Sequence, residues 1–239
     1  MSRHLKGLLM TVFAVILLSP DSVLIRLVEE ASPEVDSWTV LFWRGLLYAV
    51  GVSLLVFIKY RLKTLEEFKK IGKGGLLIGL FSGISTGTFV FAIVYTSIAN
   101  ALVIISPGPI MIAIVSWFLL KEKSSLVTWA SMVIVFIGIY IVMSGSLGGE
   151  NLVGDFFALI TAVMMGFTFT LTRKYKDVNM VPVNAIGGVI AALIAYVMAS
   201  KISVPPEVVK YIIAMGAILS ISFSLITIAP RYMPAAEVG

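Results

Sequence analysis

Asp21, Arg26, Arg44 and Asp155 are ionisable side chains inside or beside long apolar stretches, which makes them the first candidates for chemistry. A charged side chain in hydrocarbon is costly unless it is paired or hydrated, so such residues mark ion pairs or solute paths. Helix rise places Asp21 and Arg44 at similar depth on neighbouring antiparallel segments, which predicts a pair between them. That pair is either structural, or binds a charged or zwitterionic solute or couples to protons. Arg26 and Asp155 lie nearer segment ends, where we expect outward snorkelling and hydration.

Further candidates interrupt or border the apolar runs. Trp43 adjoins the predicted pair, although tryptophan is also a common packing or interface anchor. Asn100 opens a predicted helix, where its alternative role is a cap. Ser106 and Pro107 begin the run Ser-Pro-Gly-Pro near the middle of the same predicted helix, and proline there predicts a kink. Freed carbonyl groups need partners in lipid, so we expect the kink to line a cavity, with a purely structural kink as the alternative. Together with the charged pair, these residues form the predicted substrate-binding or coupling set.

Four glycines recur at every fourth position of one apolar run: Gly75, Gly79, Gly83 and Gly87. A stripe without side chains lets another helix approach closely, which favours static packing. The alternative is a sliding surface beside a transport path. Both interpretations predict that Gly83→Leu is damaging.

Apolar segments of membrane-spanning length must position these residues. The chain of 239 residues is 59% hydrophobic and 13% charged, whereas soluble domains carry about 25% charged residues. A bilayer core of about 30 Å needs roughly 20 apolar residues in a helix. The predicted spans are Leu5–Val28, Trp38–Ile58, Gly74–Tyr95, Ile98–Leu120, Ser125–Ser144, Leu152–Thr172, Met180–Ala199 and Val208–Ala229. The fold class is therefore an all-α polytopic membrane protein with eight transmembrane helices and the start of a ninth at Met233.

The basic residues alternate between the loops, which predicts the orientation. Nearly all of the 18 Lys and Arg residues fall on one side, at the N-terminus, in the stretches 59–73, 121–123 and 173–176, and at Arg231. The first loop on the other side is acidic, with Glu29, Glu30, Glu34 and Asp36. Because lysine and arginine mark the cytoplasmic side, we expect a multi-pass protein of the cell (cytoplasmic) membrane with a cytoplasmic N-terminus. The stretch Arg61–Lys73 is either an amphipathic surface segment or a plain polar linker.

Composition also excludes several kinds of site. The chain has no cysteine and one histidine, His4, so thiolate chemistry is ruled out and a histidine-based metal site is not expected. No GxxxxGK[ST] loop is present, so ATP is not the internal energy source. The charges flank the apolar runs instead of forming a basic face, which argues against nucleic acid as a partner. We expect no cofactor and no metal.

A weak internal duplication suggests two halves. The segment Leu24-Ile25-Arg26 is similar to Leu171-Thr172-Arg173. The segment Tyr95-Thr96-Ser97-Ile98-Ala99 is similar to Tyr232-Met233-Pro234-Ala235-Ala236. Five helices in the first copy would make the second enter from the opposite side, as in the inverted repeats of many secondary transporters. We therefore predict a first repeat over 1–145 and a second, incomplete repeat over 152–239, with three helices and the start of a fourth.

These motifs resemble the EamA-type family of the drug/metabolite transporter superfamily. The similar stretches are Leu24-Ile25-Arg26, Phe42-Trp43-Arg44, the run Tyr95 to Ala101, Pro107, Leu119-Leu120-Lys121-Glu122-Lys123 and Tyr232 to Glu237. The resemblance implies ten helices in two inverted five-helix repeats, a central cavity lined by the first four helices of each, and alternating access. Since this chain ends just inside the ninth helix, we expect a truncated record or a fragment.

The leading functional hypothesis is a secondary transporter for a small organic metabolite, whether amino-acid-like, drug-like or another polar solute. The alternative is a non-transporting membrane scaffold or an inactive fragment. A membrane-embedded enzyme is less favoured, because it needs converging polar groups that the helices do not offer. The expected partners are the solute and the lipid bilayer, and a homodimer is left open.

Overall fold

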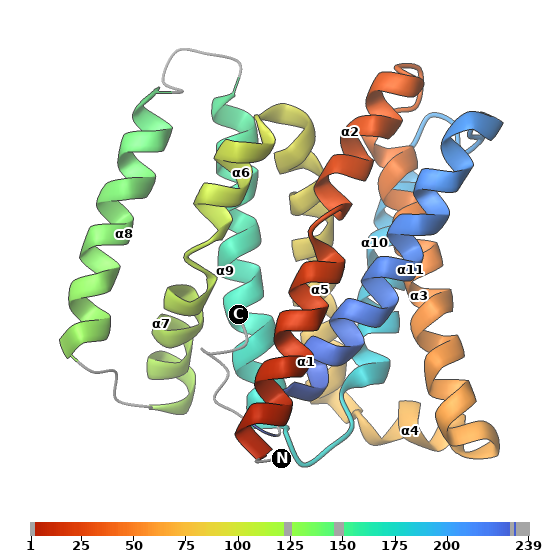
Figure 1. Ribbon diagram of the computed structural model, residues 1–239. Helices are drawn as coiled ribbons and strands as arrows, with labels where there is room; N and C mark the ends of the chain where they lie inside the picture. Colours follow the sequence, from red (N-terminus) through yellow and green to blue (C-terminus); the bar gives the residue numbers. More distant parts are fainter. Residues whose placement is uncertain (1–2, 122–125, 146–150, 230–231, 233–239) are drawn as a thin grey trace.

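The computed structural model describes residues 3–121, 126–145, 151–229 and 232. Within these residues the chain is helical and has no strand (Figure 1). The elements are α1 Arg3–Leu18, α2 Asp21–Ala31, α3 Ser37–Tyr60, η1 Arg61–Lys63, α4 Thr64–Lys70, α5 Gly72–Tyr95, α6 Ile98–Ile105, α7 Gly108–Leu120, α8 Leu126–Gly145, α9 Leu152–Lys174, α10 Val181–Met198 and α11 Pro206–Ile228. Helices suit a lipid environment because all their backbone hydrogen bonds are internal to one segment.

The predicted first span is interrupted, which corrects the single helix Leu5–Val28. α1 ends at Leu18 and α2 begins at Asp21, with Ser19 and Pro20 between them. Proline has no backbone N–H and its ring clashes with the preceding turn, so the helix cannot run through it unbroken. The carbonyl oxygen of Pro20 accepts a hydrogen bond from the backbone N–H of Leu24 at 2.9 Å, which starts α2. The apolar run continues across the break, so its hydropathy does not show it.

The predicted kink at Pro107 is confirmed as a complete break. α6 ends at Ile105 and α7 begins at Gly108, and Figure 1 shows the two helices offset from one another. The backbone N–H of Met111 donates to the Pro107 carbonyl oxygen at 3.1 Å, so the new helix starts directly from the proline. Two of the predicted spans are thus discontinuous helices.

Seven stretches of the described residues are long and apolar enough to cross a membrane by length and composition. They are Leu5–Ala31, Ser37–Lys70, Gly72–Tyr95, Ile98–Leu120, Leu152–Lys174, Val181–Met198 and Pro206–Ile228. The predicted fifth span matches α8, of which Met132–Ile141 is recognised as a shorter apolar helix. The predicted start of a ninth helix at Met233 lies outside the described residues. The chain is therefore a multi-pass membrane protein, as its composition predicted.

The stretch after α3 forms a short surface segment. Leu62 of η1 is 98% exposed and Leu65 of α4 is 65% exposed, while Ile71, directly after α4, is buried. Glu67 of α4 accepts a hydrogen bond from the side-chain amide of Asn179 at 2.9 Å, which ties α4 to the residues before α10. Gly72 follows with φ of 56°, a conformation that suits glycine, and starts α5.

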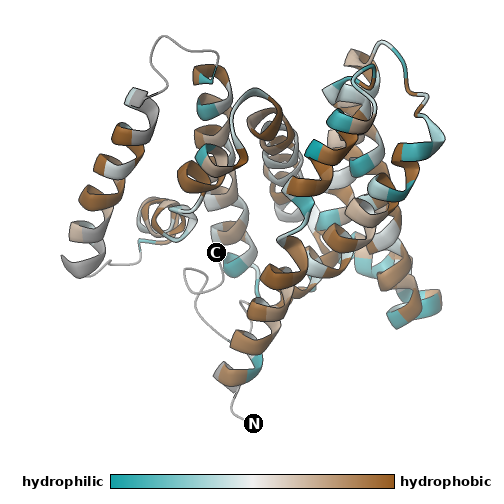
Figure 2. Cartoon of the chain, turned by 45° about the horizontal axis from the view of Figure 1, so that its top comes forward, coloured by the Kyte–Doolittle hydropathy of each residue, from teal (hydrophilic) through white to brown (hydrophobic). Residues whose placement is uncertain are grey.

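The helices pack around a centre formed by α3, α5, α10 and α11. α3 contacts α10 and α11, while α10 contacts α3 and α5. α9 packs against α5, α6 and α7, and α1 and α2 pack against α11. Figure 2 shows that apolar residues cover most of the length of the helices and that hydrophilic residues gather towards their ends. The start of α1, α4 and the α9–α10 connection lie at the same end of the bundle in Figure 1, so the predicted basic segments share one side.

Candidate functional site

A pocket of about 320 Å³ lies between the helices of both predicted halves. This volume is at the lower end of the roughly 300–1,000 Å³ typical of small-molecule sites. Its apolar lining comprises Val15, Leu18, Phe89, Leu102, Ile105, Met165, Phe169 and Phe223. Its polar lining comprises Ser19, Asp21, Ser22, Arg44, Ser82, Ser85, Thr86, Thr161, Thr168, Thr172, Asn184 and Thr227. The pocket is thus an apolar cavity with many hydroxyl groups and one pair of charges.

Asp21 and Arg44 form the ion pair that their depths predicted. Nη2 of Arg44 lies 2.6 Å from Oδ2 of Asp21, and Nε of Arg44 donates to Oδ1 at 3.4 Å. The two side chains are 2% and 3% exposed, so the pair is almost entirely withdrawn from solvent. The guanidinium carbon also lies 5.4 Å from the centre of the Phe89 ring, a cation–π contact. A buried pair with this geometry keeps both charges compensated.

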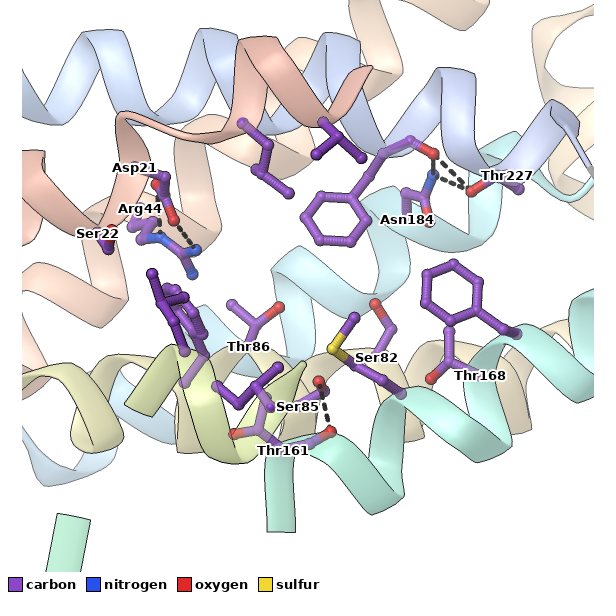
Figure 3. A pocket seen from close by; sticks show the side chains of 18 of the residues that line it. Asp21, Ser22, Arg44, Ser82, Ser85, Thr86, Thr161, Thr168, Asn184 and Thr227 are labelled. Atoms are coloured by element: carbon purple, nitrogen blue, oxygen red, sulfur yellow. Dashed lines mark hydrogen bonds and ion pairs between the residues drawn. The ribbon is translucent and has the colours of Figure 1, made fainter. Parts of the chain in front are cut away.

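The break at Pro20 explains why Asp21 occupies this place. Because α2 starts at Asp21, the carboxylate lies in the first turn of a helix, where the helix dipole favours a negative charge. Arg44 reaches it from α3, and both charged groups lie at one end of the pocket (Figure 3). The sequence signal for this site was the coincidence of two opposite charges at matching depth.

The opposite end of the pocket is built from uncharged polar groups. Asn184 of α10 donates through its amide nitrogen to the hydroxyl of Thr227 at 2.8 Å and to the carbonyl of Phe223 at 3.1 Å. Between the two ends, Ser85 of α5 donates to the carbonyl of Thr161 at 3.5 Å, which joins α5 to α9 (Figure 3). Figure 3 shows Thr168 and Asn184 far from Asp21 across the cavity. Sequence reasoning missed Asn184, although an amide inside an apolar helix is itself a signal.

The remaining predicted site residues do not line this pocket. Trp43 donates from its indole N–H to the carbonyl of Ile202 at 2.7 Å, which anchors the connection between α10 and α11. Asn100 belongs to the first turn of α6, where its backbone N–H is capped by Ser97 at 3.1 Å. Ser106 is exposed and Pro107 is buried, and the pocket is reached by Leu102 and Ile105 just before them.

Asp155 differs from its predicted hydration at the interface. Its side chain is 0% exposed, and its Oδ1 accepts a hydrogen bond from the hydroxyl of Thr96 at 2.8 Å. Arg26 donates to the carbonyl oxygen of Thr96 and also pairs with Glu29 at 2.8 Å. The turn between α5 and α6 is therefore held from both sides, by α2 and by α9. These groups lie outside the pocket lining.

The glycine stripe of α5 faces α10 only in its middle. A Cβ on Gly79 would lie 2.7 Å from the side chain of Ile186, and a Cβ on Gly83 would lie 2.9 Å from the carbonyl oxygen of Gly187. Gly75 faces Ile71 near the start of its own helix, and Gly87 makes only ordinary contact with Leu41. Close approach of α5 and α10 explains Gly79 and Gly83, whereas the sliding interpretation stays a hypothesis.

Metal chemistry finds no support in the described residues, where no group of three or more His, Cys, Asp or Glu side chains converges. The site offers instead two opposite charges, hydroxyl groups and apolar walls. This arrangement can hold an organic molecule with one polar end.

The chain is similar to a known family and to a curated protein over part of its length. Residues 5–144 match the sequence model of the EamA-like transporter family. A curated protein of Clostridium kluyveri with the name "uncharacterized transporter" is 27% identical over 170 residues, which cover 65% of this chain and 55% of that protein. This chain therefore matches little more than half the length of that relative.

Proposed function

We propose that this chain, which belongs to the EamA-like transporter family, acts as a secondary carrier that moves a small organic solute across the cytoplasmic membrane. Family membership confirms the resemblance predicted from the motifs and supports a general transporter role. It also favours a carrier over an enzyme, because the family is one of transporters. The solute, the direction of movement and alternating access belong to the proposal.

The observation that carries the proposal is the pocket itself. It is lined by residues of α1, α2, α3, α5 and α6 from the first predicted half and of α9, α10 and α11 from the second, with the Asp21–Arg44 pair at one end. Intramembrane ionisable residues that face an interior cavity usually serve transport. A solute held there would contact both predicted halves, as alternating access requires.

Reciprocal helix contacts support an inverted repeat. If α3 corresponds to α10, α5 to α11, and α1–α2 to α9, then the α3–α11 contact has its counterpart in the α5–α10 contact. The α5–α9 contact likewise has its counterpart in the contact of α1 and α2 with α11. This exchange is what a two-fold axis between two inverted repeats would produce. We therefore propose that 1–145 and 152–239 belong to two such repeats, with α8 as the fifth transmembrane helix of the first.

The bilayer is the proposed environment, with the basic end of the bundle in the cytoplasm. Large apolar side chains of α8 such as Ile134 and Ile141 are exposed, and lipid or a second copy of the chain would cover them. A homodimer therefore stays part of the proposal.

A comparison of metabolites tests the carrier. Cells that lack the protein are compared with cells that express the full-length protein, Arg44→Gln, or Arg26→Gln as a matched control outside the pocket. A solute whose distribution depends on the protein and is lost only in Arg44→Gln is the expected result. No solute difference between expressing and deficient cells would count against transport.

A further inference from the structure

One nitrogen of the buried Arg44 guanidinium has no partner. Nε and Nη2 both donate to Asp21, whereas Nη1 is buried without a hydrogen-bond acceptor among the described residues. A buried donor that has lost its hydrogen bonds to water and has gained none from the protein destabilises the fold. Native structures rarely keep such a donor without a reason. A ligand acceptor that is absent from the structure would be such a reason.

The unpartnered nitrogen belongs to a side chain that points into the pocket. Arg44 extends from α3 towards the cavity, where Ser22 and Thr86 are its labelled neighbours in Figure 3. No hydrogen bond is recorded for the hydroxyls of Ser22 and Thr86 within the described part of the chain, so both are available to a ligand. This end of the pocket thus offers one guanidinium N–H group and two hydroxyls as donors, and Arg44 is the one cationic side chain in the described pocket lining.

The other end of the pocket carries aromatic rings beside its uncharged polar groups. Phe223 lies beside Asn184, whose amide donates to its carbonyl at 3.1 Å, and Phe169 follows Thr168 along α9. Asn184 and Thr168 lie across the cavity from Arg44 (Figure 3). A molecule that spans the pocket therefore meets a guanidinium at one end and aromatic rings at the other.

We propose that the pocket binds a solute with a carboxylate head and an apolar body, and that Nη1 of Arg44 donates to the carboxylate. This inference rests on the proposed carrier function and names its solute class. A carboxylate is the acceptor that matches a guanidinium best, since charge-assisted hydrogen bonds are shorter and stronger than neutral ones. The hydroxyls of Ser22 and Thr86 complete the head-group site.

Two matched probes test the head group. We would measure binding of 4-phenylbutanoate and of 4-phenylbutanamide, which differ only in the charged head, to the full-length protein in nanodiscs. The butanoate is expected to bind at least about tenfold more tightly than the amide. Arg44→Gln should remove this preference, and the double variant Asp21→Asn/Arg44→Gln should remove it without leaving a buried unpaired carboxylate. Arg26→Gln should keep it, because Arg26 pairs with Glu29 outside the pocket.

The binding results test the carboxylate site independently of the carrier function. Equal binding of the two probes, or a preference that survives in both Arg44 variants, overturns the carboxylate site but leaves a solute pocket. Failure of both probes to bind also overturns it, while transport still stands or falls with the metabolite comparison.

Discussion

Gly45 of α3 and Gly188 of α10 face each other backbone to backbone. A Cβ on Gly45 would lie 2.8 Å from the carbonyl oxygen of Gly188, and a Cβ on Gly188 would lie 2.6 Å from the carbonyl oxygen of Gly45. Any larger residue at either position would push the helices apart. α3 and α10, which supply Arg44 and Asn184 to the pocket, are therefore held together by glycine at both positions.

The α5–α10 contact gives the first prediction. Gly83→Leu should destabilise the protein by about 1–3 kcal/mol, the usual cost of overpacking, because its Cβ would meet Gly187 and Ile190 at 2.9 Å. Thermal unfolding in detergent measures this. Gly138→Leu in α8 is the control, since nothing lies within 4 Å of its Cβ. Equal midpoints for the two variants would contradict the packing.

The ion pair gives the second prediction. Arg44→Ala should abolish transport while the protein still inserts in the membrane. It should also destabilise the fold by about 3–5 kcal/mol, because removal of one partner leaves a buried uncompensated charge. The double variant Asp21→Asn/Arg44→Ala should recover much of this stability but no transport. Full activity in Arg44→Ala, measured by uptake or efflux of the solute, would refute the role.

The N-terminal end of α3 gives a prediction about pH. Burial acts to raise the pKa of Asp36, but hydrogen bonds from Thr39 and Ser200 outweigh it and hold the pKa below its ordinary value of 3.8. A lowered pKa means that the carboxylate stabilises the fold fully above the ordinary value, and that this contribution disappears as the pH falls through the lowered pKa. Asp36→Asn should therefore be less stable at neutral pH and should lose part of the acid sensitivity. Unfolding midpoints between pH 3 and pH 7 would show identical slopes if the carboxylate contributed nothing.

The absence of cysteine permits a direct test of orientation. Single variants Lys63→Cys and Glu34→Cys introduce the only thiols of an otherwise cysteine-free chain. Membrane-impermeant maleimide applied to intact cells should label Glu34→Cys and leave Lys63→Cys unlabelled until the cells are opened. Labelling of both from the outside would refute the proposed threading.

Sequence predicted the spans well because hydropathy over some twenty residues reflects the thickness of the bilayer. It also predicted the Asp21–Arg44 pair, since depth follows from helix rise. It missed the break at Pro20 because the apolar run is continuous there, and only the local rule about proline would have revealed it.

The direction in which side chains point was harder to predict. Trp43 was grouped with Arg44 because they are adjacent, yet neighbours on a helix point about 100° apart. Arg44 consequently reaches the pocket while Trp43 reaches Ile202. The depth estimate for Asp155 likewise placed it near the interface but could not show that Thr96 covers it. The threonines of α9 do not stand out in the sequence, and only the packing shows which of their hydroxyls face the cavity.

α3 and the segment that follows it contact the second half of the chain at three levels along the bundle. Asp36 holds Ser200 at one end, Gly45 meets Gly188 along the length, and the α4 segment that continues α3 holds Asn179 through Glu67 at the other end. We expect helices held together in this way to keep their relative position. For the proposed carrier, we therefore expect the solute to enter and leave through movement of the interrupted helices, at their breaks at Pro20 and Pro107.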